Sequence, residues 1–384
     1  MTTSTENPVR TRRAPACTAE LVTDDTAFAA LAPAWDRLYR RCSAATPFQS
    51  HTWLHSWWLS YGRPGRLRLF LVRGADGELL AAAPLMAVRR PLPALVPLGG
   101  TISDYGDVLL DDEHAEGAAA ALTGRLTEAA RTALIDLREV RPGAAAERIY
   151  ARWSGPRRRV SDSVCLELPA LPMDELIARL PSAKTQQRVR AKLRKLGALG
   201  IRRQVVPPAE VDGAVRRLLA LHRLQWQGRR VTGEHLRPRF AEHLVRAVGP
   251  MVRSGDAVVT EFHLDGDVVA VDVALASPRL AGGYLYGAHP LLRERKADVA
   301  VMLLDACAEH VLTGRRGTLS LLRGDESYKH RWRPEPVVNQ RLLLARRSTA
   351  PLLGAALAQA GARHRAKQLL QRWRDREREG GGRS

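Results

Sequence analysis

The chain has 384 residues, of which 45% are hydrophobic, and it carries a formal charge of +20. This length and composition are typical of a folded protein of about two domains, and no run of about 18 apolar residues is present that would span a membrane. The first residues lack the apolar core of a secretory signal, and four scattered cysteines give no metal-binding spacing, so a reduced cytoplasm is the expected location.

Arginine supplies nearly all of the positive charge. Such a charge attracts phosphates, nucleic acid or acidic lipid without selecting among them. The excess of alanine, arginine, leucine and glycine is also what a GC-rich coding bias produces. The charge by itself is therefore no evidence for nucleic-acid binding.

The first elements are expected to be two helices behind a disordered tail at residues 1–18. The first helix begins near Asp24, and its apolar stripe is formed by Phe28, Leu31, Trp35 and Leu38. The second covers 48–61 and is rich in tryptophan. Its aromatic side chains favour core packing over a ligand wall.

A β-hairpin follows the two helices. Strands are predicted at 67–72 and 79–88, because Asp76-Gly77 between two apolar runs is a strong turn signal. Pro84 indicates that the second strand is irregular or lies at an edge. A helix at 114–132 and a strand at 134–137 complete this series.

The second half of the chain repeats the plan of the first. The elements predicted there are strands at 257–264 and 268–276 around Asp265-Gly266, a strand at 283–287, a helix at 298–312 and a strand at 319–322. Gly266 follows Gly77 by 189 residues. The ordered series predicts an internal duplication, with domains at 19–165 and 166–347 and a basic tail at 348–384.

A basic segment at 184–203 separates the two halves. It predicts an amphipathic helix whose cationic side carries Lys184, Arg188, Lys192 and Lys195. A solvated face and a ligand-contacting face both fit this pattern. Two further helices are predicted at 215–226, which includes His222, and at 240–252.

The densest group of titratable side chains follows the strand at 319–322. Gly324 breaks that strand, and the next residues include Asp325, Glu326, Tyr328, Lys329 and Arg331. Functional groups often lie on loops that a rigid strand positions, so this segment is a candidate site. The alternative is a solvated turn in which the charges pair with one another.

A second cationic group precedes the helix at 298–312. Arg293, Arg295 and Lys296 lie just before its N-terminus, where free backbone N–H groups attract anions. Asp298 is expected to cap the helix. This arrangement fits a pyrophosphate such as that of coenzyme A.

These motifs resemble those of the GNAT acyltransferases, specifically the CelD-like subgroup related to the Fem-type peptidoglycan aminoacyltransferases. The segments that carry the resemblance in the second half are Leu221-His-Arg-Leu-Gln-Trp226, Asp265-Gly266, Tyr286-Gly287 and 323–332. In the first half they are 48–58, 83–85 and 103–105.

The resemblance covers about 20–345 and implies an α/β chain with two tandem GNAT-like domains, each a mixed sheet flanked by helices. GNAT enzymes usually carry a glycine-containing loop before the long helix, whereas 292–298 here contains no glycine. Coenzyme A is therefore an inference from the family rather than from a motif.

The resemblance also implies roles for individual residues. In Fem-type enzymes a lysine in the position of Lys329 stabilises the tetrahedral intermediate or holds the donor. From the chemistry of the side chains, Tyr328 could protonate the leaving group, and Asp325 or Glu326 could accept the amine proton, unless both carboxylates only orient the neighbouring cations. His222 fits either a base or a packing residue.

The candidate site residues fall into three groups. The catalytic candidates are Lys329, Tyr328, Asp325 and His222. The candidates for acyl-CoA binding are Arg293, Arg295, Lys296 and Tyr286, of which Tyr286 fits a core position equally well. The substrate-binding candidates are Asp272, Asp104, Tyr105, Glu326 and Arg331. Asp272 lies in an apolar strand and must be paired or functional.

The function expected from these residues is that of an N-acyltransferase. It would move an acyl group, expected to be acetyl, from acyl-CoA to an amine of a small molecule or amino sugar, without a metal. One alternative is transfer from aminoacyl-tRNA, with the basic helix on RNA phosphates; tRNA is the less favoured partner. Another is a non-catalytic scaffold in a biosynthetic complex. The sequence indicates neither the acceptor nor the oligomeric state.

Overall fold

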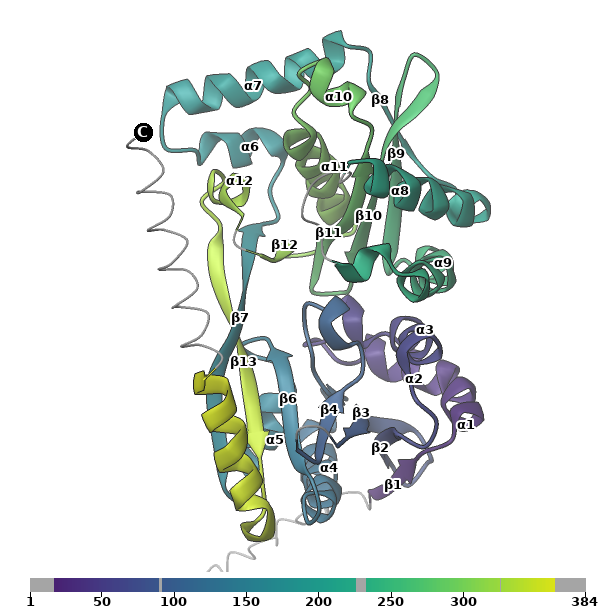
Figure 1. Ribbon diagram of the computed structural model, residues 1–384, viewed down its shortest axis with the longest axis vertical. Helices are drawn as coiled ribbons and strands as arrows, with labels where there is room; N and C mark the ends of the chain where they lie inside the picture. The colour runs from purple at the N-terminus through teal and green to yellow at the C-terminus, as the bar shows by residue number, and fades with distance from the viewer. Residues whose placement is uncertain (1–16, 90–91, 226–232, 325, 363–384) are drawn as a thin grey trace, which may run out of the picture.

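The computed structural model describes residues 17–89, 92–225, 233–324 and 326–362. Of the tail expected at 1–18, residues 1–16 lie outside these ranges, as does the candidate Asp325. The tail was predicted about one residue too long, because Thr18 begins the first strand, β1, and pairs with Arg73. Within them the chain forms a large mixed sheet with the strand order β1-β2-β3-β4-β6-β13-β7-β12-β11-β10-β9-β8, and β5 pairs with β3 (Figure 1). The α/β class expected from the sequence is confirmed.

The first half of the chain runs from β1 to β7. Its strands are β1 (Thr18–Val22), β2 (Leu67–Arg73), β3 (Leu79–Val88), β4 (Ala94–Pro97), β5 (Leu109–Leu110), β6 (Leu134–Val140) and β7 (Arg157–Pro169). Its helices are α1 (Asp25–Ala30), α2 (Ala32–Arg40), α3 (His51–Tyr61), α4 (Ala115–Ala129) and α5 (Ala146–Arg152).

The second half begins with two helices that precede its first strand. Its helices are α6 (Met173–Ala178), α7 (Ala183–Ala198), α8 (Val211–Gln225), α9 (Pro238–Arg253), α10 (Leu291–Glu294), α11 (Val299–Thr313) and α12 (Ser327–His330). Its strands are β8 (Arg202–Val205), β9 (Ala257–Leu264), β10 (Asp267–Ala276), β11 (Leu280–Ala288), β12 (Thr318–Arg323) and β13 (Glu335–Leu344).

The two halves have the same strand order. In each, four neighbouring strands pair in sequence (β2-β3-β4-β6 and β9-β10-β11-β12), and the last of the three junctions is the parallel one. That parallel junction is short in both halves: β4 and β6 share two residue pairs, as do β11 and β12. The predicted duplication is therefore confirmed as a structural repeat.

The halves exchange their final strands. The strand β7 ends the first half but pairs with β12, and β13 ends the second half but pairs with β6. The two exchanged strands also pair with each other along most of their length, which makes the sheet continuous from one half to the other (Figure 1). The boundary predicted between residues 165 and 166 falls inside β7, and the division into domains stays a prediction.

The sequence predicted that the strand containing Pro84 is either irregular or at an edge of the sheet. The strand is β3, which lies inside the sheet between β2 and β4, so the edge alternative is wrong. On one side β3 pairs with β5 through Ala81 and Ala82, and with β4 from Leu85 onward. Pro84 falls between these two partners. A residue without an N–H group is tolerated there because neither strand requires a ladder hydrogen bond at that position.

An apolar core continues across the junction of the halves. The helix α3 packs against α9, with Trp53 fully buried and 4.4 Å from the ring of His243, and with the Ser56 hydroxyl donating to the His243 carbonyl oxygen at 2.9 Å. The aromatic side chains of α3 thus pack in the core, as the sequence favoured.

Part of the predicted basic tail belongs to the fold. Residues 350–362 are helical, and Leu353 and Ala356 are buried against Leu134 and Leu343. Among the described residues, no helix is both long and apolar enough to cross a lipid bilayer.

Candidate functional site

A cavity of about 280 Å³ opens where β11 and β12 diverge. The two strands pair only at Leu280–Thr318 and Ala281–Leu319, so they separate beyond this point and leave space between them. The cavity is lined by residues of β10, β11, β12, α11 and α12 and by Trp332; they are Asp272, Gly283, Tyr286, Ala300, Leu303, Leu304, Cys307, Leu319, Ser320, Leu321, Tyr328, Lys329 and Trp332.

Asp272 supplies a buried carboxyl group to an otherwise largely apolar wall. Its exposed fraction is 3%, and the thiol of Cys307 donates a weak hydrogen bond to it at 3.7 Å. A Cβ at Gly283 would lie 3.3 Å from the Cys307 sulfur and 3.6 Å from a carboxyl oxygen of Asp272. The glycine therefore keeps space free beside the carboxyl group.

Burial raises the pKa of Asp272 to about 7, and the Cys307 hydrogen bond only partly opposes this. The unfolded chain holds this carboxyl near its ordinary pKa of 3.8. Because the folded-state pKa is the higher one, the fold loses stability as pH rises from about 4 through 7.

We expect Asp272→Asn to remove this pH-dependent loss. Between pH 5 and pH 8 the wild type should lose about 2 kcal/mol of unfolding free energy relative to the variant. Urea unfolding at pH 5, 6, 7 and 8 measures the difference. Parallel stability curves for the two proteins would show that the carboxyl group has an ordinary pKa.

The short helix α12 places a lysine and a tyrosine at the cavity. The ammonium group of Lys329 donates to the Arg323 carbonyl oxygen at 3.2 Å and pairs with Glu326 at 2.8 Å, and Lys329 is 7% exposed. Tyr328 is 43% exposed, and burial of its hydroxyl raises its pKa, so the phenol is neutral and can donate a hydrogen bond. The cavity therefore has a cation and a proton donor on its α12 side.

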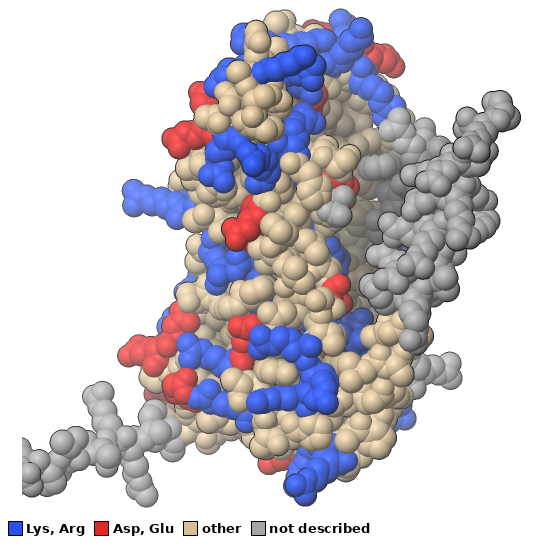
Figure 2. All heavy atoms as spheres, turned by 90° about the vertical axis from the view of Figure 1, so that its left-hand side faces the viewer, with Lys and Arg blue, Asp and Glu red and all other residues tan. Residues whose placement is uncertain are grey.

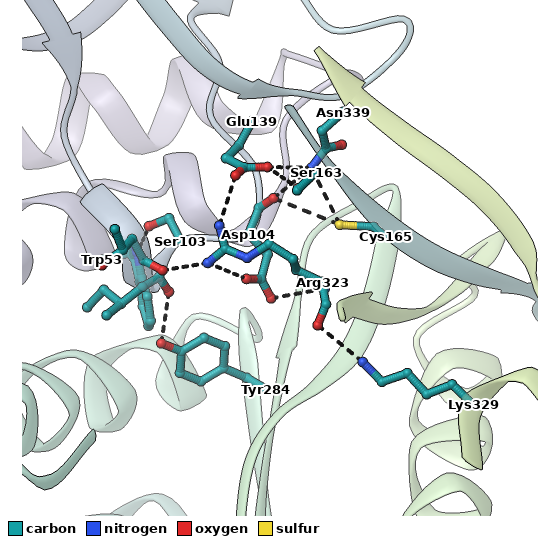
Figure 3. A network of polar contacts seen from close by, with 12 residues as sticks. Trp53, Ser103, Asp104, Glu139, Ser163, Cys165, Tyr284, Arg323, Lys329 and Asn339 are labelled. Atoms are coloured by element: carbon teal, nitrogen blue, oxygen red, sulfur yellow. Dashed lines mark hydrogen bonds and ion pairs between the residues drawn. The ribbon is translucent and has the colours of Figure 1, made fainter. Parts of the chain in front are cut away.

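Arg323 connects this corner to the first half of the chain (Figure 3). Its guanidinium pairs with Glu139 at 2.9 Å and Asp104 at 3.2 Å, and donates to the Thr101 carbonyl oxygen at 2.5 Å. Its own carbonyl oxygen receives the Lys329 hydrogen bond. The position of Lys329 thus depends on contacts that cross the junction between the halves.

Two substrate-binding candidates lie at this junction and not in the cavity. Burial raises the pKa of Asp104 to about 6, although Arg323 opposes the shift. The hydroxyl of Tyr105 donates to Glu167 at 3.2 Å and lies 3.0 Å from the Ser320 hydroxyl. Tyr105 also lines a separate cavity of about 320 Å³, whose wall includes residues of the first half together with Arg323, Arg341, Ala356 and Gln359.

Cations surround the start of α11. Asp298 caps the helix by accepting from the Val301 N–H at 3.1 Å, and it pairs with Lys192 at 2.5 Å and Arg331 at 3.5 Å. Burial disfavours its ionisation, but the Lys192 and backbone hydrogen bonds outweigh burial and lower its pKa. These partners neutralise the charge that would otherwise repel an anion from the helix N-terminus.

The predicted acyl-CoA candidates differ in where they lie. Tyr286 lines the cavity. Arg293, Arg295 and Lys296 are exposed on and after α10 and do not line it. A role for them on a phosphate group outside the cavity stays a prediction.

His222 lies away from the cavity. It is 5% exposed on α8, and its ring nitrogen Nδ1 lies 2.8 Å from the Tyr286 carbonyl oxygen. Burial lowers its pKa. This placement is that of the packing residue that the sequence left open; its role as a base stays a prediction.

The structure thus brings four candidates together: Asp272, Tyr286, Tyr328 and Lys329 line one cavity. Glu326 and Arg331 do not line the cavity. Glu326 pairs with the cavity residue Lys329, and Arg331 pairs with Asp298 at the start of α11. Sequence reasoning gave no role to the other polar residues of the wall, Cys307 and Ser320. No local signal identifies them, because each lies in an apolar element and meets its partner only in the tertiary structure.

Comparison with known proteins adds a family. Residues 183–330 match the model of the acetyltransferase (GNAT) domain. No curated protein matches the chain in sequence. Several solved structures match it in fold at low identity.

The structure of FemX is 11% identical, with a TM-score of 0.58, and covers 84% of this chain and 96% of its own. The C-terminal domain of a putative lysylphosphatidylglycerol synthetase from Agrobacterium fabrum is 12% identical, with a TM-score of 0.55, and covers 87% and 96%. A conserved protein of unknown function from Bacteroides thetaiotaomicron is 11% identical, with a TM-score of 0.53, and covers 82% and 97%.

Residues 183–330 of the second half thus match a GNAT acetyltransferase domain, and this range contains every residue that lines the cavity except Trp332. The chain as a whole shares its fold with FemX and with the synthetase domain. The resemblance drawn from the sequence is thus confirmed at the level of domain and fold. These similarities select neither the acyl group nor the acceptor.

Proposed function

We propose that the chain is an N-acyltransferase that transfers an acyl group, acetyl in the simplest case, from acyl-CoA to an amine of a small molecule or amino sugar. The observation that carries this proposal is the cavity between β11 and β12, where Lys329, Tyr328, Tyr286 and Asp272 meet inside the GNAT domain. A cation and a neutral phenol on one side of a largely apolar cavity are the groups that acyl transfer requires.

The reaction begins with attack of a neutral amine on the thioester carbonyl carbon. The new C–N bond forms as negative charge develops on the carbonyl oxygen, and the Lys329 ammonium group stabilises that charge. The C–S bond then breaks, and Tyr328 protonates the departing thiolate. The nitrogen loses its proton to a carboxylate. Of the two carboxylates considered for this role, Glu326 is the one that the structure describes, and it pairs with Lys329 at 2.8 Å.

The residues around the cavity fit a coenzyme A ester. Past Ala281, β12 gives β11 no backbone partners, so an extended arm can lie between the strands. Lys192 and Arg331 neutralise Asp298 at the start of α11. The exposed side chains of Arg293, Arg295 and Lys296 then supply positive charge for phosphate groups at the same end of the domain.

One observation favours aminoacyl-tRNA as a second candidate donor. The helix α7 contains six cationic residues and no carboxylate: Lys184, Arg188, Arg190, Lys192, Arg194 and Lys195. All of them except Lys192 are exposed. Figure 2 shows lysine and arginine side chains gathered at the end of the molecule that α7 occupies. Such a face could contact RNA phosphates, and transfer from tRNA would then weaken steeply with salt.

A donor-binding experiment tests the proposal. We expect acetyl-CoA or a longer acyl-CoA to raise the melting temperature of the full chain, because a ligand at 100 times its Kd stabilises the folded state by about 2.7 kcal/mol. The panel includes free CoA and aminoacyl-tRNA at low and high salt. Release of free thiol in the presence of an amine panel measures transfer.

Each outcome selects among the candidate functions. Stabilisation by acyl-CoA and amine-dependent thiol release support the acyl-CoA enzyme. Stabilisation by aminoacyl-tRNA alone, lost at high salt, replaces it with the tRNA-dependent reaction. The absence of any shift and of any transfer overturns both and leaves the scaffold.

A further inference from the structure

We propose that Asp272 binds the primary ammonium group of a substrate at the inner wall of the cavity between β11 and β12. This inference rests on the proposed function, because it assigns the chemistry of one substrate for the same cavity. Its starting point is the contrast between Asp272 and every other buried carboxylate of the described residues.

Seven carboxylate residues are buried in the described ranges. Six of them have either an arginine partner or several backbone N–H donors. Five pair with an arginine: Asp111 with Arg41, Asp136 with Arg341, Glu167 with Arg141, Asp256 with Arg40 and Glu261 with Arg217. Asp107 accepts from the backbone N–H groups of Val108, Ala145 and Ala146.

Asp272 is the seventh, and its hydrogen-bond partner among the described residues is the Cys307 thiol at 3.7 Å. A thiol is a weak donor and carries no charge. Burial without such compensation is costly for a carboxylate. Because Asp272 also lines the cavity, a cationic ligand group can supply the partner that this fold gives to its other buried carboxylates.

The rest of the cavity wall restricts the form of that ligand. Its walls near α11 and β12 are apolar, with Leu303, Leu304 and Leu319 among the lining residues. The lysine of the cavity, Lys329, is on α12 and repels a cation. The favoured ligand therefore has an ammonium group at the end of a short apolar stem, which reaches past Lys329 to Asp272.

Two substrates of an acyl transfer can carry this group. One is the acceptor amine itself, bound as the ammonium ion before it loses a proton. The other is an aminoacyl group, whose amine is part of the acyl donor. The shared chemistry is a primary ammonium group, and the experiment separates the two sources.

The experiment measures binding by isothermal titration calorimetry with the full chain at pH 7.5. The probe for an acceptor amine is n-butylamine, with 1-butanol as its neutral counterpart. The probe for an aminoacyl group is L-alaninamide, with L-lactamide as its neutral counterpart. We expect at least one amine to bind about tenfold more tightly than its counterpart, which is the strength of one charge-assisted hydrogen bond.

Two variants assign the effect to the carboxylate. Asp272→Asn should lose about tenfold in affinity for the amine and keep its affinity for the neutral counterpart. Cys307→Ala removes the thiol but keeps the carboxylate, and it should bind the amine as the wild type does. Binding of n-butylamine should also weaken about tenfold from pH 8 to pH 6, because the carboxyl group becomes protonated.

The outcomes are distinct from those that test the proposed function. Selective binding of n-butylamine assigns the site to the acceptor, and selective binding of L-alaninamide assigns it to an aminoacyl donor. Equal binding of amines and neutral counterparts, or unchanged affinity in Asp272→Asn, overturns the inference even if acyl-CoA transfer is observed. Amine binding that depends on Asp272 upholds it even if no transfer is found.

Discussion

Replacing Lys329 with alanine should reduce kcat/KM for acyl transfer by about 100-fold or more, because the variant loses the cation that faces the developing oxyanion. Lys329 is held in place by the Arg323 carbonyl oxygen at 3.2 Å and by Glu326 at 2.8 Å. Initial rates with the donor that binds in the stability panel measure the effect.

The fold should survive this substitution. Lys329 is buried, but its partner Glu326 is exposed and stays solvated when the lysine is removed, so no unpaired charge is left in the core and the urea midpoint should change little. Lys329→Arg should recover part of the activity because it restores the charge. Arg253→Ala, which removes an exposed cation of α9, is the matched control. Wild-type rates in Lys329→Ala would remove the lysine from the mechanism and favour the scaffold.

Replacing Arg341 with leucine should destabilise the chain by about 3 kcal/mol. Arg341 lies on the exchanged strand β13, and its guanidinium makes two hydrogen bonds to Asp136 of β6, at 2.6 and 2.8 Å. Both side chains are buried, so the substitution leaves a carboxylate in the core. Arg138 also contacts Asp136 at 3.2 Å, which keeps the expected cost at the lower end for a broken buried pair.

Urea unfolding of three variants tests this expectation. Arg203→Leu, which breaks exposed ion pairs with Asp305 and Glu309, should cost less than about 1 kcal/mol. The double replacement of Asp136 and Arg341 by leucine should recover part of the stability lost in the single variant. An Arg341→Leu protein as stable as the wild type would show that β13 does not depend on this pair.

Local sequence patterns predicted the repeated elements well. The Asp-Gly turns of Gly77 and Gly266 identified both hairpins, and the apolar runs identified β9, β10, α11 and β12 almost to the residue. These elements are predictable because turn geometry and apolar periodicity act over a few residues. The sequence reading assigned no strand at β7 or β13, although these two join the halves.

The candidate site was predicted only in part. Lys329 and Tyr328 were found because a dense charged segment follows a buried strand, and Asp272 because a carboxylate interrupts an apolar one. Their meeting in one cavity depends on the divergence of β11 from β12. The sequence did not identify Cys307 as a site residue, because its thiol meets Asp272 only in the folded structure.

The sequence by itself determined the α/β class, the internal duplication and the charged segment after β12, because each follows from turns and periodicity within one stretch of chain. Only the tertiary structure decided that the last strands change places and that residues of the first half hold Arg323, whose carbonyl oxygen accepts from Lys329. It also decided that, among the buried carboxylates of the described residues, Asp272 has only a thiol as its hydrogen-bond partner. These features depend on contacts between residues far apart in the chain, which local patterns do not encode.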